Sequence, residues 1–459
     1  MLATAAGLVL LLLGAAYAVV AASLPRRAGE APLPGLAAPL EVALDSRAIA
    51  IVRGESFADV LRGQGYLHAQ ERFFQMDLLR RSSAGELAEL FGERALAADR
   101  GQRPFDYRAH ARRLRSTLPA EQSAWLDAYT EGVNAGLADL GARPPEYWLV
   151  GAAPRPWAAD DTLLVVLTFY TMLSNNDTYE RAQGVMHEVL PSPLYDFLTP
   201  STSRFDRPVL GSTPSDPTGG YVPLPIPGPD VVDLRRQRAP EPDGTPRVEP
   251  PLTGPASNNW AVDATRGAAG RAIVANDPHL SLRLPNIFYR VELEWEDRAL
   301  RGVSIPGLPG VLIGASNDVA WGATVSNADQ SDWIVVEVDP ADPSRYLTPD
   351  GYEPFATGVA EIAVAGGEPV RIETRATRWG PVVATDWRGR PLALHATWLE
   401  PQGLDLDIVG LAQAGDVASA SAILARWAGP SLNWVLADRA GDVAWVANGP
   451  LPRRVGFDG

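Results

Sequence analysis

The sequence SNNW occupies residues 257–260, and NDPH follows at residues 276–279, nineteen positions after Ser257. This serine lies deep inside a chain of 459 residues. A serine ahead of such a run suggests a residue that becomes a new N-terminus and then acts as a nucleophile, with its own α-amine as the base. We therefore expect a chain that cleaves itself and hydrolyses amides.

Composition excludes several classes of protein. The chain is 46% hydrophobic and long enough for two or three ordinary domains or one large layered one. Its net charge of −15 argues against a nucleic-acid partner, because such proteins carry basic patches. Cysteine is absent, which excludes disulfides, thiol catalysis and cysteine-based zinc sites.

The N-terminus resembles a targeting segment. Residues 1–25 contain no charged side chain, and residues 8–13 are purely aliphatic. A stretch of roughly 20 such residues is long enough to cross a bilayer as a helix. The sequence Ala-Tyr-Ala at residues 16–18 is equally compatible with signal-peptide cleavage. Anchor and cleaved signal both remain open, and either predicts a periplasmic or other extracytoplasmic location.

The next part of the chain, residues 26–200, is predicted to be mainly helical. Residues 41–53 alternate in the manner of a short β-hairpin, and Ser56 resembles a helix N-cap with Asp59 three residues later. Apolar spacing predicts helices at residues 57–81, 119–140 and 160–172.

The pattern changes in the second half. Residues 201–256 are rich in Pro, Gly and Asp and predict an exposed linker or spacer peptide. Residues 257–459 then follow a period of two. Strands are predicted at residues 272–275, 288–295, 311–313, 319–324, 333–338, 435–437 and 443–446, with a hairpin turn at 438–441.

Several further motifs occur in a fixed order. They are GYLHAQ at residues 65–70, GELAE at 85–89, SNNWAV at 257–262, ANDPHL at 275–280, PGLPG at 306–310 and AWGAT at 320–324. In this order the chain resembles the penicillin acylase (penicillin amidase) family of N-terminal-nucleophile (Ntn) hydrolases. The resemblance implies an α+β fold, an αββα sandwich of antiparallel sheets with a mainly helical N-terminal segment.

The chemistry of such a serine can be stated from general principles. A free hydroxyl is a poor nucleophile and needs a neighbouring base. An α-amine has an ordinary pKa of about 7.7–8.0, so part of it is neutral near neutral pH. Ser257 at a chain terminus would carry that amine itself, after its hydroxyl has attacked the carbonyl of Ala256 to release the new terminus. The resemblance implies that the amine acts through a bridging water.

The oxyanion formed in the reaction needs positioned donors, each contributing about 2.7–4 kcal/mol. The resemblance assigns these roles to the backbone N–H of Val325 and the side-chain amide of Asn433. It also implies that Arg454 lies near that asparagine. His279 occupies a position where some family members have a histidine in contact with the nucleophile's terminus, so it is a candidate for tuning the amine.

A structural calcium ion is the expected cofactor, with none required for the chemistry. Asp329, Ser331 and Asp332 lie on one short loop and offer hard oxygen ligands. The resemblance adds Glu180 as a distant carboxylate ligand. Such an ion would hold the two segments together after cleavage.

The segment from Ser257 to Gly459 is shorter than the family's post-cleavage chain, so we expect it to be incomplete. Candidate substrates are small N-acyl amides, such as β-lactam side-chain amides or acyl-homoserine lactones. Two alternatives remain open. One is a serine hydrolase with a Ser-His-Asp triad, although no G-x-S-x-G motif surrounds Ser257. The other is an inactive, membrane-anchored binding or scaffold protein.

Overall fold

The computed structural model describes residues 2–174, 177–200, 223–233, 256–267, 269–280 and 282–456. The chain divides into two compact units. Unit 1 comprises residues 1–175, 255–384 and 391–459, and unit 2 comprises residues 176–254 and 385–390. Most of the linker predicted at residues 201–256 lies outside the described residues, so its character stays a prediction, as do the segment boundaries.

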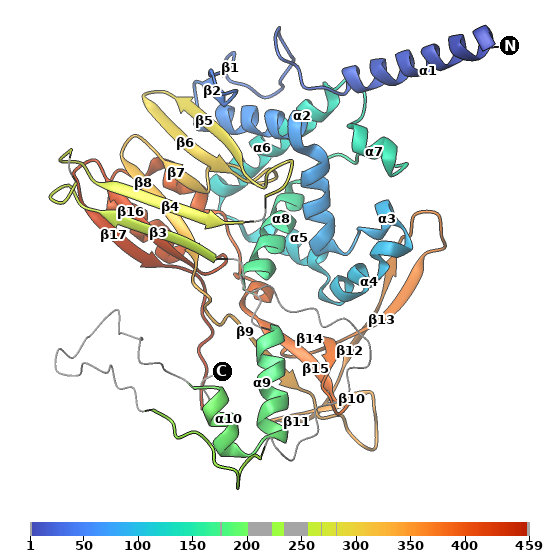
Figure 1. Cartoon of the computed structure of the whole chain (residues 1–459), viewed down its shortest axis with the longest axis vertical. Coiled ribbons are helices and arrows are strands. Elements are labelled where there is room, and N and C mark those ends of the chain that lie inside the picture. The colour runs from blue at the N-terminus through green and yellow to red at the C-terminus, as the bar shows by residue number, and fades with distance from the viewer. Residues whose placement is uncertain are drawn as a thin grey trace. The chain divides into compact units, whose positions relative to one another are not determined.

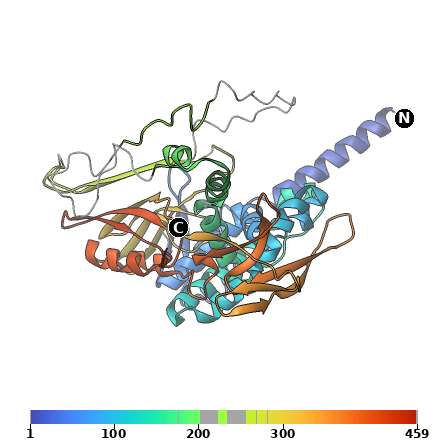
Figure 2. The same cartoon turned by 90° about the horizontal axis from the view of Figure 1, so that it is seen from below.

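The apolar N-terminal residues form α1 (Leu2–Ala22), which projects from the rest of unit 1 in both views (Figures 1 and 2). Its last turn is held by a hydrogen bond from the Ala142 backbone N–H to the Ala22 carbonyl, 3.1 Å long. Within the described part of the chain, no helix is long and apolar enough to cross a membrane.

Helix α2 (Phe57–Ala84) confirms the helix predicted from residue 57. Ser56 caps its N-terminus. The Ser56 hydroxyl accepts a hydrogen bond from the Asp59 backbone N–H at 3.1 Å, which satisfies a donor that the first turn cannot pair. It ends at Gly85, where φ is +65°, a conformation that glycine adopts without a Cβ penalty.

Helix α2 packs closely on α6 (Ala120–Ala138), the second predicted helix. The approach is so close that a Cβ at Gly132 would lie 1.9 Å from the Arg62 carbonyl oxygen. The third predicted helix is α8 (Ala159–Leu173), which is apolar and largely buried. The other helices of unit 1 are α3 (Ala88–Phe91), α4 (Glu93–Gln102), α5 (Tyr107–Thr117), α7 (Pro145–Leu149) and α11 (Val417–Arg426).

The largest sheet has eight strands in the order β1-β2-β5-β6-β7-β8-β16-β17 (Figure 1). The strands are β1 (Glu41–Leu44), β2 (Ala50–Gly54), β5 (Tyr289–Trp295), β6 (Arg298–Ser304), β7 (Ile313–Ala315), β8 (Val319–Val325), β16 (Leu432–Asp438) and β17 (Val443–Ala447). Neighbours pair antiparallel except β2 and β5, which are parallel. The predicted hairpin at 41–53 thereby joins a sheet built mainly after Ser257, and the α+β class is confirmed.

A second, five-stranded sheet has the order β12-β13-β14-β15-β9, and two further strands form a hairpin. They are β9 (Ser331–Val335), β12 (Ala356–Ile362), β13 (Val370–Thr377), β14 (Gly380–Thr385) and β15 (Pro391–Ala396), with the hairpin β10 (Arg345–Thr348) and β11 (Gly351–Pro354). The strand predicted at 311–313 is displaced, because β7 begins only at Ile313. The strand predicted at 333–338 ends early, at Val335.

Unit 2 contains α9 (Asp177–Val189) and α10 (Ser192–Leu198). The Glu188 carboxylate lies 2.9 Å from Arg388 and 2.8 Å from Arg390. These ion pairs hold α9 to the short turn at residues 385–390.

Buried charges on α2 form the polar centre of the helical layer. Asp77 is fully buried and accepts hydrogen bonds from Arg80 at 2.7 Å and Arg81 at 2.9 Å. The Tyr147 hydroxyl donates to the other Asp77 oxygen at 2.6 Å. Burial alone would raise the pKa of Asp77, but the two arginines hold it below its ordinary value. Each charge therefore depends on its partners for stability.

We expect Asp77→Ala to lower the free energy of unfolding by about 3–5 kcal/mol, because it leaves two buried guanidinium groups without their shared partner. Urea unfolding would measure the loss. Glu361→Ala provides the control, since its ion pair with Arg371 is exposed and should contribute no more than about 1 kcal/mol. Equal effects of the two substitutions would contradict this account.

His68 lies in a directional chain of hydrogen bonds. Its Nε2 is 3.0 Å from the Ser304 hydroxyl, which itself donates to the Tyr289 carbonyl at 3.1 Å. Its Nδ1 is 2.7 Å from the Tyr129 hydroxyl, which accepts from the Gly307 backbone N–H at 2.9 Å. Because Ser304 gives its proton away, Nε2 carries the imidazole proton and Nδ1 accepts from Tyr129. This neutral form is fully paired, as expected of a buried structural histidine.

Burial, with a smaller contribution from the charge of Arg72, lowers the pKa of His68 from 6.5 to about 3. The unfolded chain then binds more protons than the folded one between these values. Stability from the neutral imidazole is fully present above about pH 6.5 and falls with pH, by at most about 1.4 kcal/mol per unit.

The His68→Gln variant should therefore lose less unfolding free energy than the wild-type chain between about pH 7 and pH 5. The control variant is Gln413→Ala, because Gln413 is exposed and carries no titratable group, so the wild-type slope should be unchanged. Urea unfolding at both pH values measures the slopes. An unchanged slope in His68→Gln would sink the assignment.

Candidate active site

Ser257 lies on β3 (Ala256–Val262), which pairs antiparallel with β4 (Ile273–His279). Ser257 is opposite Pro278, and Asn259 is opposite Asn276. Side chains alternate along a strand and directly opposed residues share a face, so Ser257, Asn259 and Asn276 lie on the same face of this hairpin. Trp260 lies on the other face and is exposed.

The β3–β4 hairpin packs against β8 and β16 of the eight-stranded sheet (Figures 1 and 2). Asn259 Nδ2 donates to the carbonyl oxygens of Asn433 at 2.8 Å and Gly322 at 3.2 Å. Asn276 pairs with Ala323 twice, its Nδ2 donating to the carbonyl at 3.0 Å and its Oδ1 accepting from the N–H at 3.0 Å. These bonds fix the two sheets relative to each other and place β3 over β16.

Gly322 makes this close stacking possible. An added Cβ at this position would lie 2.9 Å from the Asn276 Cβ and 3.2 Å from its Cγ. Those atoms sit near the backbone of β4 and cannot rotate away. The glycine of the AWGAT motif is therefore required by packing against the smaller sheet.

Val325 and Asn433 lie together at the ends of β8 and β16. Asn433 Nδ2 is 3.4 Å from the Val325 carbonyl oxygen. The Ser326 N–H donates to the Ser431 carbonyl, so Ser326 and Ser431 are a hydrogen-bonded pair. The next pair, Val325 and Leu432, is then a non-hydrogen-bonded pair, and the Val325 N–H points away from β16. On that side β7 pairs with β8 only at positions 320–321. The two proposed oxyanion donors are thus neighbours.

Gly322 faces the β3–β4 hairpin, and Thr324, two residues further along β8, lies on the same face of the large sheet. Asn433 is directly opposite Thr324, so it also lies on the face that the hairpin covers. Ser257 follows the same face of β3 as Asn259, which bonds the Asn433 backbone. The structure thereby brings Ser257, Asn433 and Val325 into one region between the two sheets.

His279 is not brought to Ser257 in this arrangement. It is opposite Ala256 in the β3–β4 register, which puts it on the other face of the hairpin. Its Nε2 is 2.9 Å from the Asp277 carboxylate, and the histidine side chain is 44% exposed. Its role at the amine stays a prediction.

Arg454 binds the acidic loop. Its Nη2 is 2.8 Å from Asp329 Oδ2, and its Nε is 2.9 Å and 3.1 Å from the two oxygens of Asp332. No hydrogen bond or ion pair connects it to Asn433 among the described residues. The predicted place of Arg454 near Asn433 stays a prediction.

The predicted calcium ligands divide between the two units. In unit 1, Asp329 Oδ1 and Ser331 Oγ are buried and have no hydrogen-bond partner in the described part of the chain. Glu180 lies on α9 in unit 2 and is half-buried. Among the described residues, no cluster of three or more acidic or histidine side chains has the geometry of a metal site. Ser331 and Asp332 are successive residues of β9, so their side chains lie on opposite faces of that strand, and the predicted ligand set stays a prediction.

Gln330 was not anticipated from the sequence. It is 1% exposed, and its Oε1 accepts from Ser174 at 2.8 Å and from the Ser431 N–H at 3.1 Å. Its Nε2 donates to Tyr170 at 2.9 Å and to the Pro450 carbonyl at 3.0 Å. The loop after Val325 is therefore fixed by its central side chain, and no local sequence signal marks a glutamine for this role.

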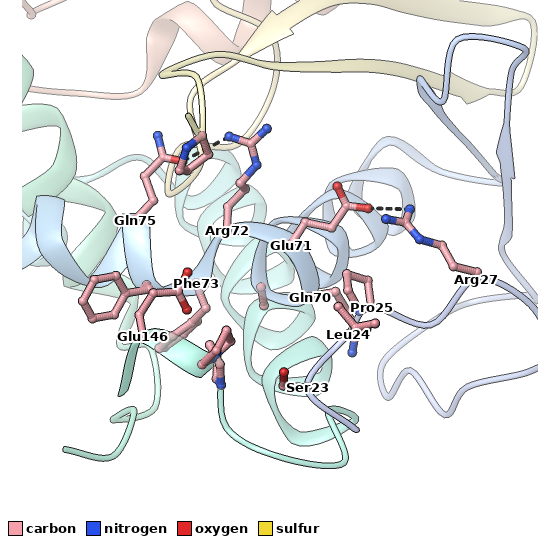
Figure 3. Close-up of a pocket in the computed structure, with 15 residues that line it drawn as sticks. Ser23, Leu24, Pro25, Arg27, Gln70, Glu71, Arg72, Phe73, Gln75 and Glu146 are labelled. Atoms are coloured by element: carbon pink, nitrogen blue, oxygen red, sulfur yellow. Dashed lines mark hydrogen bonds and ion pairs between the residues drawn. The ribbon is translucent and has the colours of Figure 1, made fainter. Parts of the chain in front are cut away.

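A cavity of about 260 Å³ lies elsewhere, against α2 (Figure 3). Its polar lining includes Arg27 and Glu71, which pair at 3.0 Å, and Arg72. None of its lining residues belongs to β3, β4, β8 or β16, so we do not assign it to the candidate site.

Stacked sheets with a serine near the start of the covering strand are the arrangement expected of the α+β Ntn-hydrolase class. The sequence model described as penicillin amidase matches residues 39–459. The chain therefore belongs to the penicillin amidase family.

The chain is also similar to individual proteins. The penicillin acylase 2 proenzyme of Pseudomonas sp. (strain SE83) is 30% identical over 94% of this chain and 55% of its own length. The acyl-homoserine lactone acylase QuiP of Pseudomonas fluorescens (strain Pf0-1) is 28% identical over 94% and 53%. A thermostable penicillin G acylase from Alcaligenes faecalis aligns with a TM-score of 0.40 and 24% identity over 43% of this chain and 36% of that one. The chain spans about half the length of the curated relatives it matches.

We expect Gly322→Ala to separate the β3–β4 hairpin from the large sheet, because the new methyl group overlaps Asn276. Loss of the paired Asn276 bonds should speed amide exchange in β3 and β4 about ten-fold, which hydrogen–deuterium exchange would measure. Gly101→Ala is the control, since a Cβ there meets nothing within 4 Å. Unchanged protection of β3 would show that the stacking tolerates a side chain at position 322.

Proposed function

We propose that this chain is a self-processing acylase that hydrolyses N-acyl amides of small molecules through an acyl-enzyme on Ser257. The observation that carries the proposal is the arrangement between the sheets, where the strand led by Ser257 is bonded through Asn259 to the backbone of Asn433, beside Val325.

In the proposed mechanism Ser257 Oγ first attacks the Ala256 carbonyl, and breakage of the Ala256–Ser257 amide bond forms an ester and frees the α-amine. Water then hydrolyses the ester, which releases the Ala256 carboxylate and restores the Ser257 hydroxyl. In turnover that amine accepts the hydroxyl proton through a water while Oγ attacks the substrate carbonyl. The Val325 N–H and the Asn433 side chain donate to the developing oxyanion. The leaving amine takes the proton, and water then releases the acid. His279 and Arg454 remain candidates for support of this site.

The substrate class is proposed from the relatives, which are named as penicillin acylases and acyl-homoserine lactone acylases. Both names describe removal of an acyl group from an amide nitrogen on a small ring. We propose the same reaction type here, without choosing between the two amine halves. The proposed location is extracytoplasmic, supported by the uncharged residues 1–25.

The two segments should stay together after cleavage. Strand β2 from the N-terminal segment pairs with β5, and α2 packs against the same sheet. A calcium ion is proposed as a structural cofactor at Asp329, Ser331 and Asp332, supported by the buried Asp329 Oδ1, which has no hydrogen-bond partner among the described residues. It would supply charge balance for the loop that follows Val325. The role of Glu180 as a calcium ligand stays a prediction.

The purified wild-type chain should separate into two polypeptides in intact-mass analysis, and the shorter should begin at Ser257 on N-terminal sequencing. Ser257→Ala should remain a single chain and lose hydrolysis of N-acyl amides, because nucleophile and base belong to the same residue. Ser344→Ala, at an exposed position, is the control and should process normally.

The alternatives give different results. Hydrolysis by an uncut chain would favour a conventional serine hydrolase. A folded, uncut wild-type chain that binds ligands without turnover would favour a binding or scaffold protein. Unchanged hydrolysis in Ser257→Ala would refute the proposal.

A further inference from the structure

We propose that Asn448 is a positioning residue for the side-chain amide of Asn433, one of the two proposed oxyanion donors. This inference rests on the function proposed above and adds a residue that holds one of its donors in place. Asn448 acts through the first residues of β16, which it bonds on both sides of Asn433.

The side chain of Asn433 is held weakly by its own contacts. Among the described residues, its one hydrogen bond runs from Nδ2 to the Val325 carbonyl oxygen and is 3.4 Å long, beyond the usual range of about 2.7–3.2 Å. An amide nitrogen carries two N–H groups, so the second one is available to an oxyanion. The direction of this amide therefore depends mainly on the backbone of β16.

Asn448 continues the ladder between β16 and β17 at the point where β17 ends. The last residue of β17 is Ala447, which is opposite Asn433. At the next pair, the Asn448 backbone N–H donates to the Leu432 carbonyl at 3.3 Å. The return bond goes to the side chain, because the Leu432 N–H donates to Asn448 Oδ1 at 3.0 Å. The side-chain oxygen thus takes the place of a strand carbonyl directly before Asn433.

The same amide bonds the residue after Asn433. Asn448 Oδ1 also accepts from Trp434 Nε1 at 2.8 Å, and its Nδ2 donates to the Pro430 carbonyl at 3.2 Å. Side chains alternate along a strand, so Leu432 and Trp434 lie on the face opposite to the Asn433 side chain. Asn448 is 4% exposed, so water does not readily replace a bond that it loses. It therefore supports β16 around Asn433 and leaves the Asn433 amide free.

The reaction should be sensitive to this support. An oxyanion donor acts only when its N–H points at the position that the oxyanion takes, and a misplacement of about 1 Å can lower a rate about 10²-fold. Without the Asn448 amide, the Leu432 N–H and the Trp434 indole N–H lose their acceptor and the start of β16 can shift. The donor is needed in the transition state rather than for substrate binding, so the loss should fall on kcat and not on KM.

The test variant is Asn448→Leu, which is similar in shape and has no hydrogen-bonding side-chain group. The backbone of residue 448 keeps its bonds to Leu432 and to the Ser431 hydroxyl, the latter at 2.6 Å, so the path of the chain should be retained. Gln122→Leu is the matched control. Gln122 is also 4% exposed, and its amide bonds residues 406–407 at 2.9 Å and 2.7 Å, with no bond to β3, β8 or β16.

Hydrolysis of an aromatic and an aliphatic probe, N-phenylacetyl- and N-octanoyl-p-nitroaniline, measures kcat and KM. Rates are expressed per chain that begins at Ser257 in intact-mass analysis. We expect Asn448→Leu to lower kcat at least about ten-fold and to leave KM within about two-fold of the wild-type value. Gln122→Leu should lower Tm by a similar amount and keep both constants within about two-fold.

Unchanged kcat in Asn448→Leu, a loss carried by KM, or an equal loss of kcat in Gln122→Leu would overturn the inference and leave the proposed function standing. A wild-type chain that stays uncut, or that hydrolyses neither probe, would overturn both. If Asn448→Leu does not fold or cleave itself, Trp434→Phe decides, because it removes one Asn448 bond and keeps a ring against Trp427. We expect that variant to lose at least about three-fold in kcat, and wild-type kcat there would overturn the inference.

Discussion

Side-chain amides that pair with strand backbone set the distance between the two sheets. Asn276 bonds both the N–H and the carbonyl of Ala323, which reproduces with a side chain the pairing that another strand would give. This is possible because β7 stops pairing with β8 before that residue is reached. Everything proposed for Ser257 depends on this spacing, since Asn259 bonds β3 to the backbone of β8 and β16.

The N-terminal segment contributes to the same body. Its α2 and α6 pack so closely that a glycine is needed at their contact, and its β2 becomes part of the sheet that carries Val325 and Asn433. Buried ion pairs centred on Asp77 add polar cohesion to the helical layer. A cut before Ser257 would therefore divide the chain without dividing the core.

Periodicity in the sequence predicted the main helices and the central strands because their apolar faces are buried on one side. The Ser56 cap was also visible, since its partner Asp59 lies only three residues along the chain. The five-stranded sheet was harder to predict from the sequence. Its strand β12 is exposed at most positions, so its sequence carries no apolar alternation. β6 was missed because charged Arg298 and Arg301 interrupt its apolar residues.

The candidate site also contains residues that the sequence predicted and contacts that it did not. The sequence motifs predict Ser257, Val325 and Asn433 as site residues, and this stays a prediction; in the structure Asn433 lies beside Val325 and bonds through its backbone to Asn259 of the strand that carries Ser257. Partners separated by long stretches were not predictable, because spacing carries no information about them. Arg454 bonds Asp332, which is 122 residues away in the sequence, and Gln330 bonds Tyr170, which is 160 residues away. The face on which His279 lies depends on the register of β3 with β4, which composition does not reveal.

The parallel pair of β2 with β5 has a consequence for the order of events during synthesis. Arg53 and Glu294 bond at 2.6 Å although 241 residues separate them. Closing so long a loop is entropically unfavourable and makes assembly slow. The N-terminal helices therefore emerge from the ribosome well before their sheet can exist, and they expose apolar faces until β5 has been translated. If the chain is cut before Ser257 only after β2 has paired with β5, its two segments assemble as one molecule rather than as two that must meet.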